Sequence, residues 1–154
     1  KEISRVMSLR DGTKKMSKSE DSDQSRINLK DDRDTINQKI KKAKTDNEAI
    51  PSEINGLKNR NEAVNLISIY ASINGIELSQ VLKEFGGKNF STFKSKLSES
   101  LIEKICPIGN EMKKLLKDNN YLNEILKKGT KKADLIAKNN IKEIYDIIGI
   151  TKFS

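Results

Sequence analysis

After residue 30, apolar residues recur every three or four positions, the spacing that places them along one face of an α-helix. Glycines follow several of these stretches, as expected where helices stop, and no segment alternates strictly enough to predict a ladder of strands. We therefore predict a mainly α-helical chain whose helices form a five- to six-helix bundle. The predicted helices are residues 31–44, 60–74, 79–85, 91 to about 115, 121–128 and 130–148.

The two longest predicted helices carry the clearest core stripes. Pro107 lacks an N–H and crowds the preceding turn, so we expect it to bend the first of them. Gly129 is expected to end a short helix before the last one starts. The stripe of the first is Phe93, Leu97, Leu101, Ile105, Ile108, Met112 and Leu115. The stripe of the last helix is Ala133, Ile136 or Ala137, Ile141, Ile144 or Tyr145, and Ile148.

The first 30 residues show no helical period. Residues 3–9 are typical of a short extended segment, and Asp11-Gly12-Thr13 signals a turn after it. The residues that follow, through Ser25, are almost entirely polar. A segment of this composition buries too little surface to become rigid by itself, so we expect a mobile, flexible loop.

The chain is basic, with 30 Lys and Arg against 22 Asp and Glu and a net charge of +8. This surplus favours a polyanionic partner such as nucleic acid, although lysines on the solvated faces of helices give the same composition. Most of the surplus falls in residues 113–142, where nine lysines stand against three acids. Composition alone leaves the two interpretations even.

The chain has one cysteine, Cys106, and no histidine. A lone cysteine forms no internal disulfide and no zinc site, so a reducing, cytoplasmic setting is the simplest inference. We expect Cys106 to be a small, buried or half-buried hydrophobe. The lack of histidine excludes His-dependent triads and His metal sites within this chain. No apolar run approaches the ~20 residues that span a bilayer, so no membrane partner is expected.

Candidate chemistry lies in the run Lys14-Lys15-Met16-Ser17-Lys18-Ser19. It places two lysines three residues apart, with hydroxyl groups between and after them, on a polar tether. Such a loop can close over a triphosphate, because ammonium groups meet the non-bridging oxygens while hydroxyl and backbone N–H groups donate further hydrogen bonds. An ordinary solvated loop would explain a generic pattern of this kind, but the complete five-residue string is more specific.

The string Lys15-Met16-Ser17-Lys18-Ser19 resembles, residue for residue, the KMSKS signature of class I aminoacyl-tRNA synthetases. The residues that lead into it resemble those of bacterial tryptophanyl-tRNA synthetases. Segments 40–46, 65–70, 87–94 and 106–108 are similar to that family in order and spacing, so the resemblance covers essentially the whole chain. One departure is Gly12, where the family commonly has proline, and we expect it to loosen the approach to the loop. Tyrosyl-tRNA synthetases typically carry Phe-Gly in place of Met16-Ser17.

The resemblance implies the C-terminal half of an enzyme that activates tryptophan with ATP, in the presence of Mg²⁺, and charges tRNA(Trp). Residues 1–46 would end its catalytic domain, and residues 47–154 would form a helical, anticodon-binding-like domain with a C-terminal helix. The family's second ATP signature, its amino-acid pocket and most of its homodimer interface belong to a half that this sequence lacks. We therefore expect the chain to be inactive alone. Residues 107–110 echo the second signature superficially, but they lie within a helical apolar stripe.

By this resemblance, Lys15 and Lys18 would hold the triphosphate and stabilise the departing pyrophosphate, with Lys18 the stronger candidate. Ser17 and Ser19 would donate hydrogen bonds to phosphate or shape the loop, and Met16 would anchor the loop or contact the adenine side. These five residues are the expected ATP-binding set, and no metal ligand stands out.

In the family the helical region contacts the anticodon arm, so we expect its lysines to form an approach surface for tRNA. For any single lysine, a solvated helix face is the alternative. Two other interpretations of the whole chain stay open: a stand-alone basic helical RNA-binding module that kept the loop by descent, and a class I synthetase for another amino acid such as tyrosine. The lysines in question are Lys113, Lys114, Lys117, Lys127, Lys128, Lys131 and Lys132.

Overall fold

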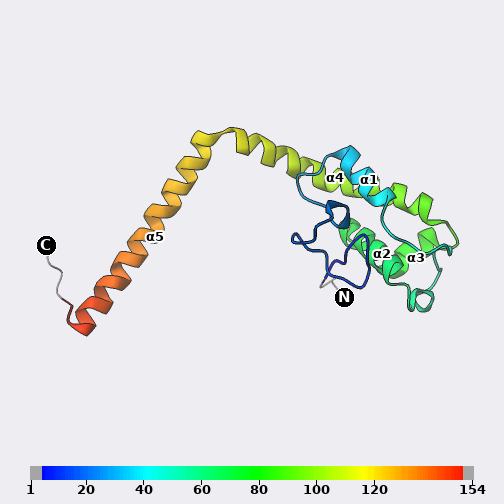
Figure 1. Cartoon of the computed structure of the whole chain (residues 1–154), viewed down its shortest axis with the longest axis horizontal. Helices are drawn as coiled ribbons and strands as arrows, with labels where there is room; N and C mark the ends of the chain where they lie inside the picture. The colour runs from blue at the N-terminus through cyan, green and yellow to red at the C-terminus, as the bar shows by residue number, and fades with distance from the viewer. Residues whose placement is uncertain (1–4, 151–154) are drawn as a thin grey trace. The chain divides into compact units, whose positions relative to one another are not determined.

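The computed structural model describes residues 5–150, so part of the extended segment expected at residues 3–9 lies outside the described residues. Residues 5–150 contain no β-strand, and one isolated antiparallel bridge joins Met7 to Lys15. Two short 3-10 turns, η1 (Asp23–Ser25) and η2 (Ile54–Leu57), lie in the connections. The prediction of a mainly α-helical chain is confirmed. Its helices (Figure 1) are α1 (Arg33–Lys41), α2 (Asn61–Asn74), α3 (Leu78–Phe85), α4 (Phe90–Lys117) and α5 (Asn119–Ile148).

The chain divides into two compact units, residues 1–111 and residues 112–154. The functional boundary predicted between residues 46 and 47 falls inside the first unit. The single core of that unit takes residues from both sides of this boundary, among them Leu9, Ile40, Leu66 and Phe93. The boundary at residues 46 and 47 therefore stays a prediction about function and does not mark a break in packing.

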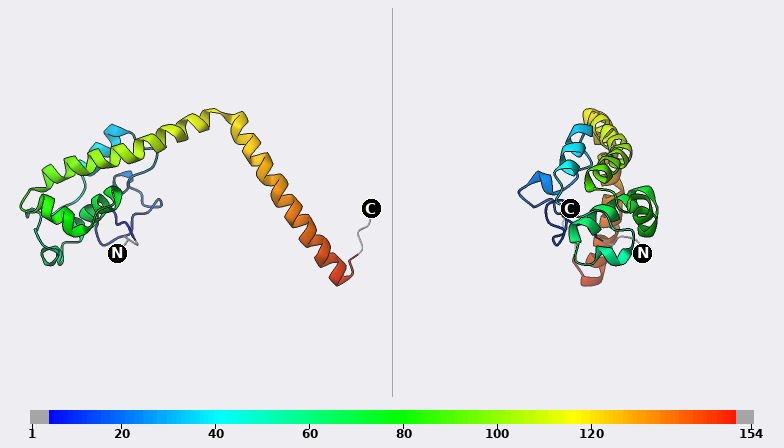
Figure 2. Two further views of the ribbon diagram at one scale, coloured as in Figure 1. Left: turned by 180° about the vertical axis from the view of Figure 1, so that it is seen from behind. Right: turned by 90° about the vertical axis from the view of Figure 1, so that its right-hand side faces the viewer.

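Three helices of the first unit meet around an aromatic cluster. Tyr70 of α2 meets Phe85 of α3 edge-on, with ring centroids 5.3 Å apart. Phe93 of α4 lies 5.0 Å from Phe85 and 5.5 Å from Tyr70. Aromatic pairs at this spacing contribute about 0.5–1.5 kcal/mol beyond the burial of their area. Figure 2 shows α2, α3 and α4 lying together in both views, which is the bundle that their apolar stripes predict.

The N-terminal segment is fixed to this bundle by a buried amide. Asn65 of α2 accepts a hydrogen bond from the Met7 N–H (3.0 Å) and donates to the carbonyls of Met7 (2.9 Å) and Ser8 (3.2 Å). The Leu9 N–H donates to the Ser25 carbonyl at 2.8 Å. Because Asn65 is 5% exposed, protein groups rather than water satisfy its amide. The segment before the lysine-rich motif therefore has a fixed position on α2.

The long helix α4 continues through Pro107. Phe93, Leu97 and Leu101 are buried as predicted, whereas Ile108, later on the same stripe, is 48% exposed. The stripe therefore serves the core of the first unit only in the first half of the helix.

Gly109 is buried within α4, and a Cβ there would lie 2.6 Å from the Leu29 carbonyl oxygen. The glycine thus lets α4 approach the loop that leads into α1, which supports a structural role for residues 107–110. Cys106 is half-buried against the core, as predicted.

The last helix, α5, is continuous over 30 residues, so the predicted break at Gly129 is wrong. The Asp118 carboxylate caps its start by accepting from the Tyr121 N–H at 2.9 Å, and Gly149 ends it with a φ of 72°. Gly129 costs a helix about 1 kcal/mol relative to alanine, which the strong helix formers on both sides outweigh. No residue of α5 is buried, and Ile136 of the predicted core stripe is 63% exposed. None of the described helices is both long and apolar enough to cross a membrane.

Candidate nucleotide-binding loop and lysine-rich helix

A tight turn organised by Asp11 leads into the lysine-rich motif. The Asp11 carboxylate accepts from the N–H (3.0 Å) and the hydroxyl (2.6 Å) of Thr13, and these hydrogen bonds are the main reason that the pKa of Asp11 is lowered. The Lys14 N–H donates to the Asp11 carbonyl at 3.1 Å. The Met16 N–H then donates to the Val6 carbonyl at 3.0 Å. The chain therefore folds back on itself and enters the motif in a fixed direction.

Gly12 lies buried in this turn, against the start of α2. A Cβ at this position would lie 2.6 Å from the carbonyl carbon of Asn61 and 2.7 Å from the amide nitrogen of Glu62. The pKa of the Glu62 carboxyl is lowered chiefly by a hydrogen bond from Lys44, and the Gly12 backbone N–H adds a smaller one. The glycine lets the turn and the helix touch, and the expectation that it loosens the approach to the loop stays a prediction.

Met16 is half-buried and packs against the core of the first unit. Together with Val6, Ile27, Ile69 and Ile73 it lines an apolar hollow of about 280 Å³. This packing fits the anchoring role expected for Met16, and the alternative of an adenine contact stays a prediction.

The two lysines that flank Met16 and Ser17 are exposed. Within residues 5–150, Lys15 and Lys18 make no side-chain hydrogen bond and no ion pair. The hydroxyl oxygens of Ser17 and Ser19 lie 2.9 Å apart, and the Ser19 N–H donates to the Ser17 hydroxyl at 3.3 Å. The serines thus brace the loop, while both ammonium groups face solvent and can take an anion.

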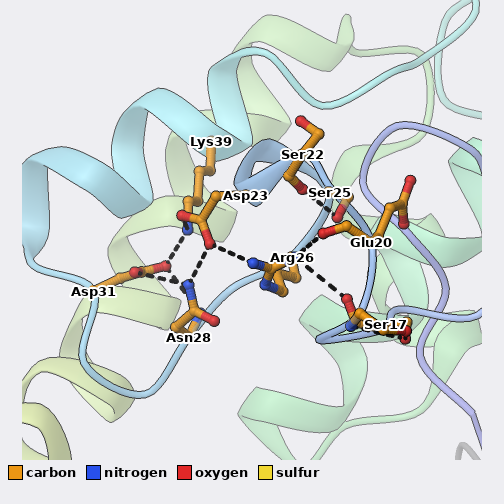
Figure 3. Close-up of polar contacts among 10 residues, drawn as sticks. Ser17, Glu20, Ser22, Asp23, Ser25, Arg26, Asn28, Asp31 and Lys39 are labelled. Carbon is orange, nitrogen blue, oxygen red and sulfur yellow. Dashed lines mark hydrogen bonds and ion pairs between the residues drawn. The ribbon is translucent and has the colours of Figure 1, made fainter.

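The residues after the motif are held by a network of charged groups (Figure 3) that the sequence did not reveal. The Arg26 guanidinium donates to the Glu20 carbonyl at 2.8 Å and, more loosely, to the Ser17 carbonyl at 3.4 Å. It also lies 3.0 Å from Asp23, whose second oxygen is 2.7 Å from the Lys39 ammonium. Charged side chains therefore hold residues 20–26 in place, although this segment has almost no apolar residues to pack.

Lys39 of α1 is the centre of this network, with its side chain 1% exposed. It lies 2.6 Å from the Asp31 carboxylate as well as 2.7 Å from Asp23. The pKa of the Asp23 carboxyl is lowered to about 2, chiefly by the hydrogen bond from Lys39 and next by the one from Asn28. The Asp23 carboxylate is thus held ionised beside a buried lysine.

The described residues contain no preformed cluster of acidic side chains for magnesium. Within residues 5–150, no three Asp, Glu or Cys side chains come together as metal ligands. The donor set of this part of the chain therefore does not fit a resident metal ion.

The lysines proposed to approach tRNA lie on the surfaces of α4 and α5, and all seven are exposed. Because α5 is unbroken, residues four apart on either side of Gly129 are neighbours on adjacent turns. At 100° per residue, its lysines fall within an arc of about 140°. Like charges at this spacing cost a helix about 0.2–0.5 kcal/mol per pair, so the arrangement is not explained by helix stability. The lysines of this arc are Lys127, Lys128, Lys131, Lys132, Lys138 and Lys142.

The lysine-rich loop lies within a segment that matches a known family. A family model described as "tRNA synthetases class I (W and Y)" matches residues 2–106, well over half of the chain. The chain belongs to the class I tRNA synthetases of this tryptophan and tyrosine type. The KMSKS-like run, residues 15–19, lies inside the matched segment.

Several relatives within the class I tRNA synthetases are identical to this chain at about half of the aligned positions. A tryptophan–tRNA ligase of Agrobacterium fabrum is 53% identical over 148 residues, which are 96% of this chain and 42% of the relative. Another of Mesorhizobium japonicum is 52% identical over 146 residues, which are 95% of this chain and 41% of the relative. The chain thus spans less than half the length of the curated relatives that it matches.

Solved structures of class I tRNA synthetases share the fold. A tryptophanyl-tRNA synthetase from Mycoplasma pneumoniae superposes with a TM-score of 0.76 at 24% identity, over 98% of this chain and 45% of that chain. A tryptophanyl-tRNA synthetase from Campylobacter jejuni, in complex with ADP and tryptophan, gives a TM-score of 0.71 at 27% identity, over 97% of this chain and 45% of that chain. The helical arrangement described above is therefore that of the C-terminal part of this family.

Proposed function

We propose that the chain is the C-terminal part of an enzyme that activates tryptophan with ATP and transfers it to tRNA(Trp). The observation that carries this proposal is the pair of exposed lysines, Lys15 and Lys18, on a braced loop of a class I tRNA synthetase. Relatives at 52% and 53% identity are named tryptophan–tRNA ligases, which favours tryptophan over tyrosine. Met16-Ser17 favours it too, because tyrosyl enzymes typically carry Phe-Gly at these positions.

In adenylate formation, a carboxylate oxygen of tryptophan attacks the α-phosphorus of ATP. The bond from that phosphorus to the bridging oxygen breaks, and pyrophosphate leaves with the negative charge. An ammonium group ~4 Å from a phosphate charge gains about 4 kcal/mol at an effective dielectric of about 20, and about 1 kcal/mol in bulk water. Only the part of this gain that grows as charge moves to the pyrophosphate accelerates the step. Lys15 and Lys18 would therefore act best when the loop closes and excludes water.

The seven lysines of α4 and α5 are proposed to meet the phosphate backbone of tRNA, whose charge density favours multiple ammonium contacts. Homodimerisation of the parent enzyme would involve the half that this sequence lacks. Magnesium is expected to arrive with ATP, because no three acidic or cysteine side chains come together as metal ligands in the part of the chain that the structure describes.

The test is alanine substitution in the full-length protein that contains this chain. We expect Lys18→Ala to lower the rate of tryptophan-dependent ATP–pyrophosphate exchange by at least about 100-fold, as typical losses of a single charge-stabilising donor are of this size. Lys15→Ala should cause a smaller loss. Lys14→Ala is the matched control, because Lys14 lies 3.7 Å from the Asp11 carboxylate and already has an ionic partner. Wild-type exchange by the double variant of Lys15 and Lys18 would overturn the proposal.

The second candidate is a stand-alone RNA-binding module, which the single-sided lysine arc of α5 favours. The two candidates differ in their need for the motif. An RNA-binding module would keep its activity, tRNA binding, after Lys15 and Lys18 are replaced. The proposed enzyme would lose adenylate formation.

A further inference from the structure

Arg26 clamps the backbone on both sides of Lys18 (Figure 3). Its Nη1 atom donates to the carbonyl oxygen of Glu20 at 2.8 Å and to that of Ser17 at 3.4 Å. These carbonyls bracket Lys18 and the residue after it. A planar guanidinium presents its donors in fixed directions, so it can hold two acceptors in a defined geometry. One side chain therefore sets the path of the main chain around Lys18.

The clamp is itself anchored to a helix in the core. The Nη2 atom of Arg26 lies 3.0 Å from one oxygen of Asp23, and Asn28 donates to the same oxygen at 3.0 Å. The other oxygen of Asp23 lies 2.7 Å from the buried ammonium of Lys39. Lys39 belongs to α1, which packs into the core through Ile40 next to it. The guanidinium is thus held in place relative to the rigid part of the first unit.

We propose that Arg26 is a positioning residue for adenylate formation, holding the backbone of residues 17–20 so that the Lys18 ammonium meets the leaving pyrophosphate. The inference rests on the role proposed above for Lys18. Without the clamp the ammonium would sample many positions, and a misplacement of about 1 Å at a reacting centre costs on the order of 100-fold in rate. Arg26 acts through the main chain and touches neither ATP nor tryptophan.

A double-mutant cycle in the full-length protein tests this. Arg26→Met should lower kcat for tryptophan-dependent pyrophosphate exchange about tenfold, as a lost charge-assisted hydrogen bond implies, with less than about a twofold change in the KM for ATP. In a Lys18→Ala background the same substitution should lower kcat by less than about twofold, because no ammonium is left to position. Arg26→Lys should recover part of the rate, since one ammonium can reach one carbonyl. Arg33→Met removes an exposed guanidinium on α1 and should leave the rate unchanged.

The possible outcomes separate the two proposals. If Arg26→Met costs the same factor with and without Lys18, its effect is a general structural one and the positioning role is wrong. If Arg26→Met has no effect, that role is wrong as well. If Lys18→Ala has no effect, the proposed function itself fails, whatever Arg26 does. If a thermal melt shows that Arg26→Met does not fold, the cycle is run with Arg26→Lys instead. A loss of about threefold in kcat that vanishes in the Lys18→Ala background would then support the positioning role. An equal loss of kcat in both backgrounds would oppose it.

Discussion

The ammonium of Lys39 lies 2.6 Å from the carboxylate of Asp31, with side chains that are 1% and 7% exposed. Burying two charges costs several kcal/mol of desolvation per ion, which is offset only when further hydrogen bonds satisfy both groups. Here Asp23 gives Lys39 a second partner at 2.7 Å. The Asn28 N–H donates to Asp31 at 2.9 Å. The pair therefore joins α1 to the connection that follows the lysine-rich loop.

Breaking this pair should destabilise the chain strongly. We expect Lys39→Met to lower the free energy of unfolding by about 3–5 kcal/mol, because it leaves the Asp31 carboxylate buried without its cation. Combining it with Asp31→Asn should recover part of the loss. Lys41→Met, on the exposed face of the same helix, should change stability by less than about 0.5 kcal/mol. Urea unfolding followed by circular dichroism measures all four proteins, and a loss below 1 kcal/mol for Lys39→Met would show that the pair contributes little.

The pH dependence of stability should report the Asp23 carboxylate. Its pKa is lowered from an ordinary value of 3.8 to about 2, so the folded state favours the ionised form. The stability that it contributes is therefore fully present above about pH 5 and is lost as the pH falls from about 4 to about 2. The difference in unfolding free energy between wild type and Asp23→Asn should shrink over this range. Asp21→Asn, an exposed neighbour, serves as the control, and a difference that stays constant down to pH 2 would contradict the assignment.

Apolar periodicity located the helices because most of them bury one face in a shared core. The predicted first residues of α3 and α4 are one residue too late, because a residue other than serine caps each helix. The start expected at residue 79 falls at Leu78, after Glu77, which forms a reciprocal capping box with Gln80. The start expected at Ser91 falls at Phe90, after Asn89, whose side chain accepts from the Thr92 N–H at 3.0 Å.

The motif of the candidate site could be read from sequence, but the groups that hold it could not. Arg26 and Asp23 are close in sequence to many other charged residues, and nothing in their spacing singles them out. Lys39 did carry a signal, since it falls three residues after buried Ile36 and beside Ile40 on the inner face of α1. A lysine at such a position needs a carboxylate partner, and Asp31 lies about two helical turns before it. Periodicity also failed at Gly129, because the cost of one glycine is smaller than the gain from the helix around it.

In this chain a side chain at Gly12 should displace the turn from α2, even though the family commonly has proline there. Gly12→Ala is expected to lower the free energy of unfolding by about 1–3 kcal/mol, because its Cβ would meet the α2 backbone at 2.6 Å. Gly12→Pro should cost more, since it also removes the N–H that contributes to the Glu62 carboxylate. Gly129→Ala is the contrasting control, because a Cβ there meets nothing within 4 Å, and it should raise the helix content or stability of α5. Unchanged thermal melting of Gly12→Ala would show that the turn can move away from α2.

The isolated 154-residue chain should show no tryptophan-dependent ATP–pyrophosphate exchange. In the proposed enzyme, the second ATP signature and the amino-acid pocket belong to a half that is not in this sequence. Lys15 and Lys18 alone can attract phosphate, but they cannot align a carboxylate with the α-phosphorus. The assay is run with the full-length protein as the positive control, and robust exchange by the isolated chain would overturn this expectation.

The lysine arc of α5 should govern the salt dependence of tRNA binding. Each ammonium that meets a phosphate releases counterions, so it adds about 0.7–0.9 to the slope of log K against log salt concentration. Replacing Lys127, Lys128, Lys131 and Lys132 with glutamine should therefore reduce that slope by about 3 and weaken binding most at low salt. A matched quadruple variant at exposed lysines of the first unit, Lys30, Lys58, Lys83 and Lys104, removes the same net charge and should change the slope by less than about 1. Equal slopes for the two variants would mean that tRNA senses overall charge and that the one-sided arc is only a solvated helix face.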